Sequence, residues 1–325
     1  LAITGSNTFG TLNIGPGRTF AMVANGVTTV GSLNTAGQNN GYLYIGGSSS
    51  DYAGTPDATQ NQITGDIDIR VDMAPNSWTA GTSGAVIGKD SVGGAGRVWQ
   101  MGLTANGVPT FTWWDSGGAL RGTFSASTAV SFTGNTRGWI RVTLDVDNGS
   151  GGHALKFWTS PAGTPVWTQL GSTLSAGAFT TSMRNQSALV SVGSAGGSSA
   201  NPAKFYRAQI RNNILDDGTG IVVDMNFSAK AFGANTFTES SVNAATVTLA
   251  GTALVGDGRV TLASLTASSP TYLMLAGEIQ SFDYLAVQDV VSLLPYKFYA
   301  GTNSVNVSGN TNVLFSNYVT STPYP

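Results

Sequence analysis

The side chains that could do chemistry are few, and the first of them is the only histidine, His153. The chain has no cysteine, so disulfides, thiolate metal sites and Cys-His nucleophiles are excluded. A zinc site made of several histidines is excluded by number, and a Ser-His-Asp triad would have to use His153. Because His153 ends the glycine-rich segment 148–153, we interpret it as a solvated turn residue.

Carboxylate pairs are the next candidates, because glycoside hydrolysis needs two carboxyl groups that face each other at about 5–10 Å. Glu239 and Glu278 are the only glutamates, and neither lies in a strongly patterned segment. One strand face carries four charged residues in alternation, namely Asp66, Asp68, Arg70 and Asp72. A face of mixed charge is typical of a solvated surface. The sequence therefore predicts a protein that is not an enzyme.

Calcium sites need several oxygen ligands that converge from loops. The segment DVDNGSGG, which starts at Asp145, begins like a calcium loop but lacks the third acid and the closing glutamate. We interpret it as the turn of a hairpin. A structural calcium near Asp90, or near Asp216 and Asp217, stays open, and no cofactor is identified.

Aromatic residues are the stronger lead to a ligand site. Neighbouring residues on a strand point to opposite faces, so Trp113 and Trp114 cannot both lie in one core. Trp158 shares a strand face with Lys156 and opposes Phe157, which predicts an outward indole ring that could stack on a sugar. The candidate ligand-binding residues are Trp114, Trp158, Lys156 and Trp113. The alternative for each is burial against another strand, arm or subunit.

These residues lie in segments that alternate between apolar and polar positions, the pattern of half-buried strands. The clearest strand covers residues 67–73, and two hairpins follow at 98–114 and 140–158. Further strands are predicted at 188–192, 204–210 and 221–227. Antiparallel hairpins in series predict an all-β fold, an antiparallel β-sandwich of the jelly-roll type, over residues 41–251.

The flanking segments differ from this pattern. Residues 1–40 hold two similar phrases, GTLNIG and GSLNTAG, which are too few copies to establish a solenoid. Within them, residues 19–23 and 27–30 surround Asn25-Gly26, a strong hairpin signal, and predict a small N-terminal β arm. Residues 252–325 predict a separate C-terminal β-rich element. Apolar residues at intervals of three and four over 282–294 predict one helix there.

The composition limits the partners. Apolar residues make up 41% of the chain, charged residues only 10%, and the formal net charge is -2. Such a neutral surface gives no field that attracts nucleic acid, and no apolar run reaches the ~18 residues of a membrane span. We expect no nucleic-acid partner and no membrane insertion. The N-terminal LAITGSNTFG also lacks the features of a signal peptide.

Several phrases resemble a known fold family. GYLYIGGSSSDYAGTPD, ITGDIDIRVDMAPNSWTAGTSGAVIGKD and GWIRVTLDVDNGSGGHALKFWTS are similar to the opening strands and central hairpin of concanavalin A-like jelly rolls of the laminin-G-like type. KFYRAQIRNNILDDGTGIVVDMNFS resembles the closing strands, in the version found in bacteriophage tail and other virion proteins. The resemblance covers about residues 41–250. No acidic metal cluster of the calcium-binding members is evident.

The resemblance implies a lectin-like module on a non-enzymatic virion protein, such as a minor tail, fibre or capsid-decoration subunit. Its flanking elements would anchor it in a homo-oligomer, and its partners would be other virion proteins, copies of itself and a host-surface glycan. We expect it at the surface or tail of a phage particle. The alternative is a secreted bacterial carbohydrate-binding module or glycanase.

Overall fold

The computed structural model describes residues 2–14, 19–35, 38–79, 83–91, 96–176, 181–230, 234–258, 260–275, 280–282, 285–293, 298–302 and 304–316. The chain divides into two compact units. One is the central segment 41–256, and the other combines the two flanks, 1–40 and 257–325. The two flanks, which the sequence predicts as an arm and a separate element, thus belong to one unit.

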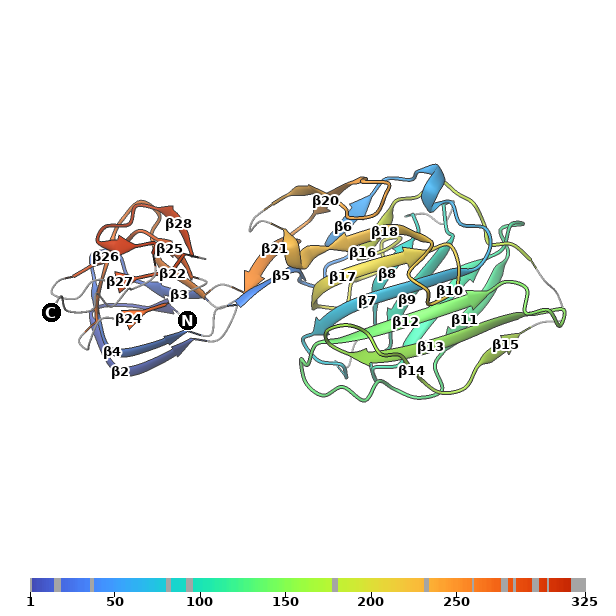
Figure 1. Ribbon diagram of the computed structural model, residues 1–325, viewed down its shortest axis with the longest axis horizontal. Coiled ribbons are helices and arrows are strands. Elements are labelled where there is room, and N and C mark those ends of the chain that lie inside the picture. The colour runs from blue at the N-terminus through green and yellow to red at the C-terminus, as the bar shows by residue number, and fades with distance from the viewer. Residues whose placement is uncertain are drawn as a thin grey trace, which may run out of the picture. The chain divides into compact units, whose positions relative to one another are not determined.

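The central unit is a sandwich of two antiparallel sheets. In the described part of the chain, the smaller sheet has the order β11 (Leu120–Ser125), β10 (Pro109–Trp114), β9 (Trp99–Leu103), β8 (Gly84–Lys89), β16 (Val190–Gly193), β6 (Tyr52–Thr55), β20 (Thr246–Ala250) and β19 (Thr236–Thr238). The larger sheet has the order β14 (Thr168–Gln169), β13 (His153–Pro161), β12 (Gly138–Asp145), β7 (Ile67–Pro75), β17 (Ala203–Arg211), β5 (Gln38–Ile45) and β21 (Leu254–Gly258). Two further strands extend it, β15 (Leu174–Ala176) on β13 and β18 (Ile221–Asn226) on β17 (Figure 1).

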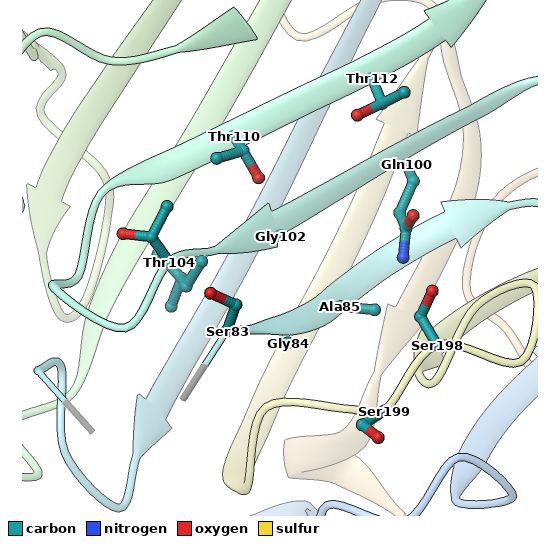
Figure 2. Close-up of a pocket in the computed structure, with 11 residues that line it drawn as sticks. Ser83, Gly84, Ala85, Gln100, Gly102, Thr104, Thr110, Thr112, Ser198 and Ser199 are labelled. Carbon is teal, nitrogen blue, oxygen red and sulfur yellow. The ribbon is translucent and has the colours of Figure 1, made fainter. Parts of the chain in front are cut away.

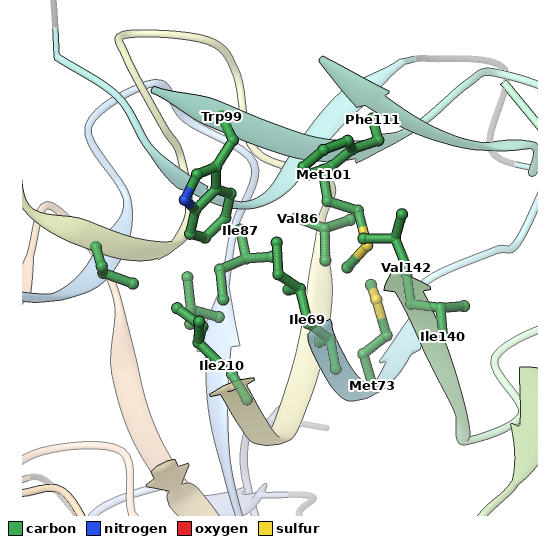
Figure 3. Packing of buried hydrophobic residues seen from close by; sticks show 14 of the residues in the cluster. Ile69, Met73, Val86, Ile87, Trp99, Met101, Phe111, Ile140, Val142 and Ile210 are labelled. Atoms are coloured by element: carbon green, nitrogen blue, oxygen red, sulfur yellow. The ribbon is translucent and has the colours of Figure 1, made fainter. Parts of the chain in front are cut away.

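The core lies between these two sheets and follows the predicted alternation. Ile69 and Met73 of β7 are fully buried, and Figure 3 shows them pointing toward Val86 of β8 and Met101 of β9. Trp99 belongs to the same cluster. The prediction of an antiparallel β-sandwich is confirmed, as are the two hairpins, β9 with β10 and β12 with β13.

The flanking unit is a parallel β-solenoid, a coil whose successive turns stack strand on strand. Its first sheet is β1 (Ala2–Ile3), β3 (Thr19–Met22), β22 (Val260–Ser264), β25 (Leu285–Gln288) and β28 (Val305–Ser308). Its second is β2 (Asn7–Ile14), β4 (Val27–Thr35), β23 (Thr271–Leu275) and β26 (Val290–Ser292), and its third is β24 (Gln280–Ser281), β27 (Phe298–Tyr299) and β29 (Val313–Leu314). All strand pairs described in this unit are parallel. From β22 to β27 the chain visits the three sheets in turn.

The two similar N-terminal phrases are successive turns of this solenoid. β2 pairs with β4 so that Leu12 lies beside Leu33, and both side chains are buried. The next turn comes from beyond the sandwich, because β22 pairs with β3 and places Leu262 beside Phe20. Val287 continues this apolar stack on the other side of Leu262. Strands that precede the sandwich in the sequence and strands that follow it therefore pair in one continuous register.

The predicted hairpin at Asn25-Gly26 and the predicted helix at 282–294 are both wrong, because each segment contains a corner of the solenoid. Asn25-Gly26 does not close a hairpin, because β3 and β4 belong to different sheets, and Asn25 turns the corner at φ 59°. The predicted helix at 282–294 contains β25 and β26. Asp289 makes a corner between them at φ 54°, and this corner interrupts the alternation and so imitates a helical spacing. Residues 283–284 and 294 of that prediction lie outside the described part.

Helical structure in the described chain is limited to two three-residue 3-10 turns, η1 (Thr59–Asn61) and η2 (Phe227–Ala229). Neither is long enough to cross a membrane, so no described helix is a candidate for a membrane span.

Candidate functional site

Polar side chains cover the outer face of the larger sheet, on the side away from the core. Strand register arranges them in three rows across β13, β12, β7, β17 and β18. The rows are Trp158, Arg141, Arg70, Gln209 and Asp224; Lys156, Thr143, Asp68, Arg211 and Ile221; and Ser160, Trp139, Asp72, Arg207 and Asn226. Arginines, carboxylates and tryptophans thus lie together on one surface.

The middle of this face is a buried ionic network around Asp68, which has no exposed surface. Asp68 Oδ2 accepts hydrogen bonds from Arg70 Nε at 3.0 Å and Nη2 at 2.6 Å. Arg141 donates from Nε to Asp68 Oδ1 at 3.0 Å and from Nη2 to Oδ2 at 2.8 Å. The half-exposed Asp216 lies 2.6 Å from Arg70 Nη2 and so pairs with the same network from above.

Two further ion pairs stand at the edges of the network. Arg137 binds both oxygens of Asp72, with an Nη2–Oδ2 distance of 2.5 Å, and burial raises the pKa of Asp72 while Arg137 opposes that change. Arg207 donates from Nε and Nη2 to the two oxygens of Asp224 at 2.7 and 2.6 Å. These hydrogen bonds raise the pKa of Arg207. Each guanidinium is therefore held in a fixed plane.

Tryptophan rings lie over these guanidinium groups. The Arg141 guanidinium carbon lies 5.4 Å from the ring centroid of Trp158 and 5.2 Å from that of Trp167. Arg70 lies 5.3 Å from the same Trp167 ring. Trp139 meets Trp167 edge to face at 6.1 Å and donates from Nε1 to the carbonyl of Gly163 at 3.0 Å. This hydrogen bond ties the loop after β13 to the sheet.

A cleft of about 520 Å³ opens between that loop and the loop after β17. Its lining combines planar charged groups, one indole and small loop residues: Arg70, Asp72, Arg137, Trp139, Gly163, Thr164, Pro165, Arg207, Gln209, Arg211, Gly218, Ile221, Asn226 and Ser228. Gln209 lies on its floor, and no hydrogen bond to its side-chain amide occurs within the described part of the protein. The cleft therefore offers an amide and fixed guanidinium groups to a ligand.

A second hollow, of about 470 Å³, lies on the smaller sheet. Figure 2 shows Gln100 of β9 and Ser198 of a neighbouring loop directed toward each other, with Thr110 and Thr112 of β10 beside them. Its lining holds hydroxyl groups, one amide and glycines, without an aromatic or charged side chain. A Cβ on Gly102 would lie 2.8 Å from the carbonyl oxygen of Gly84, so the backbones approach closely here. This groove has fewer groups that could orient a sugar.

The four predicted ligand-binding residues are divided between the sheets. Trp113 has no exposed surface and lies in the core, so its prediction as a ligand-binding residue is wrong. Trp114 is only 9% exposed and has the Arg97 guanidinium 5.5 Å from its ring, on the smaller sheet. Trp158 and Lys156 are half-buried on the outer face of the larger sheet. None of the four is among the described residues that line the cleft or the groove.

The structure corrects two further predictions. Asp68, Arg70 and Asp72 are buried, not solvated, because the loops after β13 and β17 cover them. His153 is also buried, and its ring packs edge to face on Trp113 at 5.3 Å and Phe124 at 5.6 Å. Burial lowers the pKa of His153, and the Arg121 charge lowers it further. It begins β13 and reaches the core, because strand alternation continues into the turn.

The other acidic candidates have structural partners. Glu239 is buried and accepts hydrogen bonds from the backbone of Asp224 at 2.8 Å and of Ser241 at 2.7 Å. The Asp145 segment is the turn between β12 and β13, and Asp145 Oδ1 accepts from the Asp147 amide at 3.1 Å. Glu278 lies outside the described residues. Within the described ranges no three His, Cys, Asp or Glu side chains cluster as metal ligands would.

Sequence reasoning missed Trp139, Gln209 and Arg211 as residues of the cleft. The signal was present, because Asp-x-Arg-x-Asp on β7 and Arg-x-Gln-x-Arg on β17 place complementary charges on neighbouring strands. Opposite charges on central strands predict cross-strand pairs. The loops that cover them could not be placed from the pattern.

No protein-family model and no curated protein matches this chain. Among solved structures it is similar to the CBM40 of the Ruminococcus gnavus IT-sialidase bound to alpha2,3 sialyllactose, with 16% identity over 54% of this chain and 91% of that one, at a TM-score of 0.36. It is also similar to the heptameric SAP-like pentraxin from Limulus polyphemus, with 8% identity over 55% and 78% at a TM-score of 0.34. Domains LG4-5 of the mouse laminin alpha1 chain give 13% identity over 56% and 45%, at a TM-score of 0.31.

Proposed function

We propose that this protein is a non-enzymatic structural protein that binds glycans through the cleft on the larger sheet of its sandwich. In this proposal the solenoid holds the sandwich in a larger particle, as a tail, fibre or capsid-decoration subunit of a bacteriophage. The observation that carries the proposal is the cleft itself, where fixed guanidinium groups, the Trp139 indole and the Gln209 amide converge in about 520 Å³.

These groups match the surface of a sugar. A sugar ring presents hydroxyl groups around its edge and an apolar patch on its face, so a site needs fixed donors and acceptors together with flat apolar surface. Arg70 and Arg207 are fixed by the carboxylates of Asp68 and Asp224, and Gln209 lies directly opposite Arg70 and two residues along β17 from Arg207. Such preorganised groups bind without a large loss of side-chain entropy.

The carboxylates in and beside the cleft already bind arginines, which favours binding of a glycan over its hydrolysis. Asp72 is engaged by Arg137, and Asp224 is engaged by Arg207. An acid catalyst needs a proton to give, and a nucleophile needs a free lone pair, whereas these carboxylates accept from guanidinium groups. This supports a glycan-binding role rather than that of a glycanase.

The solenoid and the composition support a place in a particle. Parallel solenoid turns stack by backbone hydrogen bonds and an apolar interior, which stabilises them without disulfides. Many copies on one particle would raise the avidity of a weak site without any new contact. We therefore expect homo-oligomers or assembly with other virion proteins.

A glycan microarray tests the proposed site when two matched substitutions are compared. Gln209→Ala removes one of the two side-chain amides of the cleft, and Gln100→Ala removes the amide of the groove on the smaller sheet. We expect the wild-type protein to bind cell-surface glycans. Gln209→Ala should lower the affinity about tenfold, and Gln100→Ala should leave the affinity unchanged. If only Gln100→Ala weakens glycan binding, the binding site is the groove on the smaller sheet and not the cleft.

Two further measurements separate the role in a particle from the alternative, a secreted module or glycanase. Electron microscopy of native particles with a labelled antibody should find the protein on the virion, in several copies. A monomer that releases reducing sugar from a bound glycan would instead support the secreted glycanase.

A further inference from the structure

Four arginines line the cleft, Arg141 lies opposite Arg70 on the same face, and four of these five have a carboxylate partner. Arg70 and Arg141 bind Asp68, Arg137 binds Asp72, and Arg207 binds Asp224. The fifth, Arg211, forms no ion pair with any carboxylate in the described ranges. One positive charge of the site is therefore uncompensated by a direct contact.

Strand register explains why Arg211 has no partner. It lies directly opposite Asp68 on the neighbouring strand, where an ion pair would be expected. Both oxygens of Asp68 are already engaged by Arg70 and Arg141, which donate four hydrogen bonds to it. Three of these bonds end on Oδ2 and one on Oδ1, so Arg70 and Arg141 take up most of the accepting capacity of Asp68. Arg211 therefore forms no hydrogen bond with Asp68 and stands outside this ionic network.

The side chain of Arg211 is only 6% exposed and lines the cleft. Its one hydrogen bond among the described residues runs from Nη1 to the carbonyl of Thr219 at 3.4 Å, and its Nε is buried without a partner. Burial lowers the pKa of Arg211, the charges of Arg70 and Arg141 lower it further, and the charges of Asp68 and Asp216 oppose this change without a direct contact. A buried, unpaired guanidinium is costly to a folded protein, so a bound anion would stabilise it.

The free edge of Arg211 also has the right shape for one kind of anion. Nη1 is turned to Thr219, so Nε and Nη2 on the other edge form a planar fork. Two parallel donors of this kind match the two oxygens of a carboxylate. Gln209 and Asn226, which also line the cleft, can then bind neighbouring hydroxyl groups of a sugar.

We propose that the cleft selects acidic glycans, and that Arg211 binds the carboxylate of a uronic or nonulosonic acid through Nε and Nη2. This inference rests on the proposed function, because it names the class of glycan that the cleft takes. Binding should weaken as salt increases, since the attraction of a carboxylate to a guanidinium is screened.

Matched oligosaccharides test this proposal by calorimetry. The probes are sialyllactose and trigalacturonic acid, each compared with its own carboxyl-reduced form, which keeps the sugar and removes the charge. The proteins are the wild type, Arg211→Gln, Arg211→Lys, and Arg97→Gln as the control, because Arg97 lies against Trp114 of the other sheet. Thermal melts show that each variant is folded.

We expect an acidic probe to bind the wild type at least about tenfold more tightly than its reduced form. Arg211→Gln should abolish that difference, Arg211→Lys should restore only part of it, and Arg97→Gln should keep it. Equal binding of acidic and reduced probes, unchanged by Arg211→Gln, would overturn this inference but leave the glycan site standing. Binding of no glycan by the wild type would overturn both.

Discussion

Arg141 and Asp68 are joined side by side across two strands, with Nε–Oδ1 and Nη2–Oδ2 distances of 3.0 and 2.8 Å, at a place where Asp68 has no exposed surface. The same carboxylate also holds Arg70. One buried negative charge therefore fixes two guanidinium groups, and through them the floor of the cleft.

Asp68→Ala should lower the free energy of unfolding by about 3–5 kcal/mol, because it leaves two buried guanidinium groups with no carboxylate on the sheet. Urea denaturation followed by circular dichroism measures the loss. Asp147→Ala, at an exposed turn position, is the control and should change the value by less than about 0.5 kcal/mol. Equal effects of the two would contradict the structural role of Asp68.

Substitution by Met should change the free energy of unfolding in opposite directions at Arg211 and at Arg207. Arg211→Met removes an unpaired buried charge and should raise the free energy of unfolding by about 1 kcal/mol. Arg207→Met leaves the buried Asp224 without its partner and should lower it by about 1–3 kcal/mol. Parallel denaturation curves decide between them. Destabilisation by both would show that Arg211 has a structural role in the free protein.

The buried His153 should make stability depend on pH. Its folded-state pKa is lowered below the ordinary value of 6.5, so the unfolded chain binds the proton more readily. Stability contributed by the neutral ring is therefore fully present above the ordinary pKa of 6.5 and is lost progressively as the pH falls from there through the lower folded-state pKa. Melting temperatures between about pH 7 and about pH 5 should decline for the wild type, with a shallower decline for His153→Gln. Identical slopes would contradict this assignment.

The two units have separate cores, and all seven tryptophans lie between Trp78 and Trp167 in the sandwich. Leu262→Ala in the solenoid core should cost that unit about 2–5 kcal/mol. Far-ultraviolet circular dichroism, which sees both units, should show an earlier transition. Tryptophan fluorescence should keep its wild-type midpoint. A shift of the fluorescence midpoint by the same amount would show that the units unfold together.

The sandwich could be predicted because its strands have one apolar face. Ile67, Ile69, Val71 and Met73 alternate without interruption, and the hairpin turns carry their own signals. The outward position of Trp158 followed from the same alternation. Local patterns suffice where each strand is long and regular.

The solenoid and the cleft could not be predicted in the same way. The solenoid corner at Asp289 interrupts the alternation between the short strands β25 and β26, so the spacing of apolar residues there resembles that of a helix. The second half of the solenoid also lies beyond the sandwich, and it joins the first half through the pairings of β3 with β22 and of β4 with β23. In the cleft, loops bury charges such as Asp68, and strand patterns carry no information about loop positions.

The pairing of β3 with β22 has a consequence for how such a protein can change. The first and last strands of the insertion, β5 and β21, are neighbours in one sheet, so the chain enters and leaves the sandwich at adjacent points. Replacing residues 41–256 with another module whose ends lie close together would leave the solenoid pairing intact. If the sandwich binds glycans as we propose, we expect that exchanging this one segment at its two junctions would change the binding specificity and keep the scaffold.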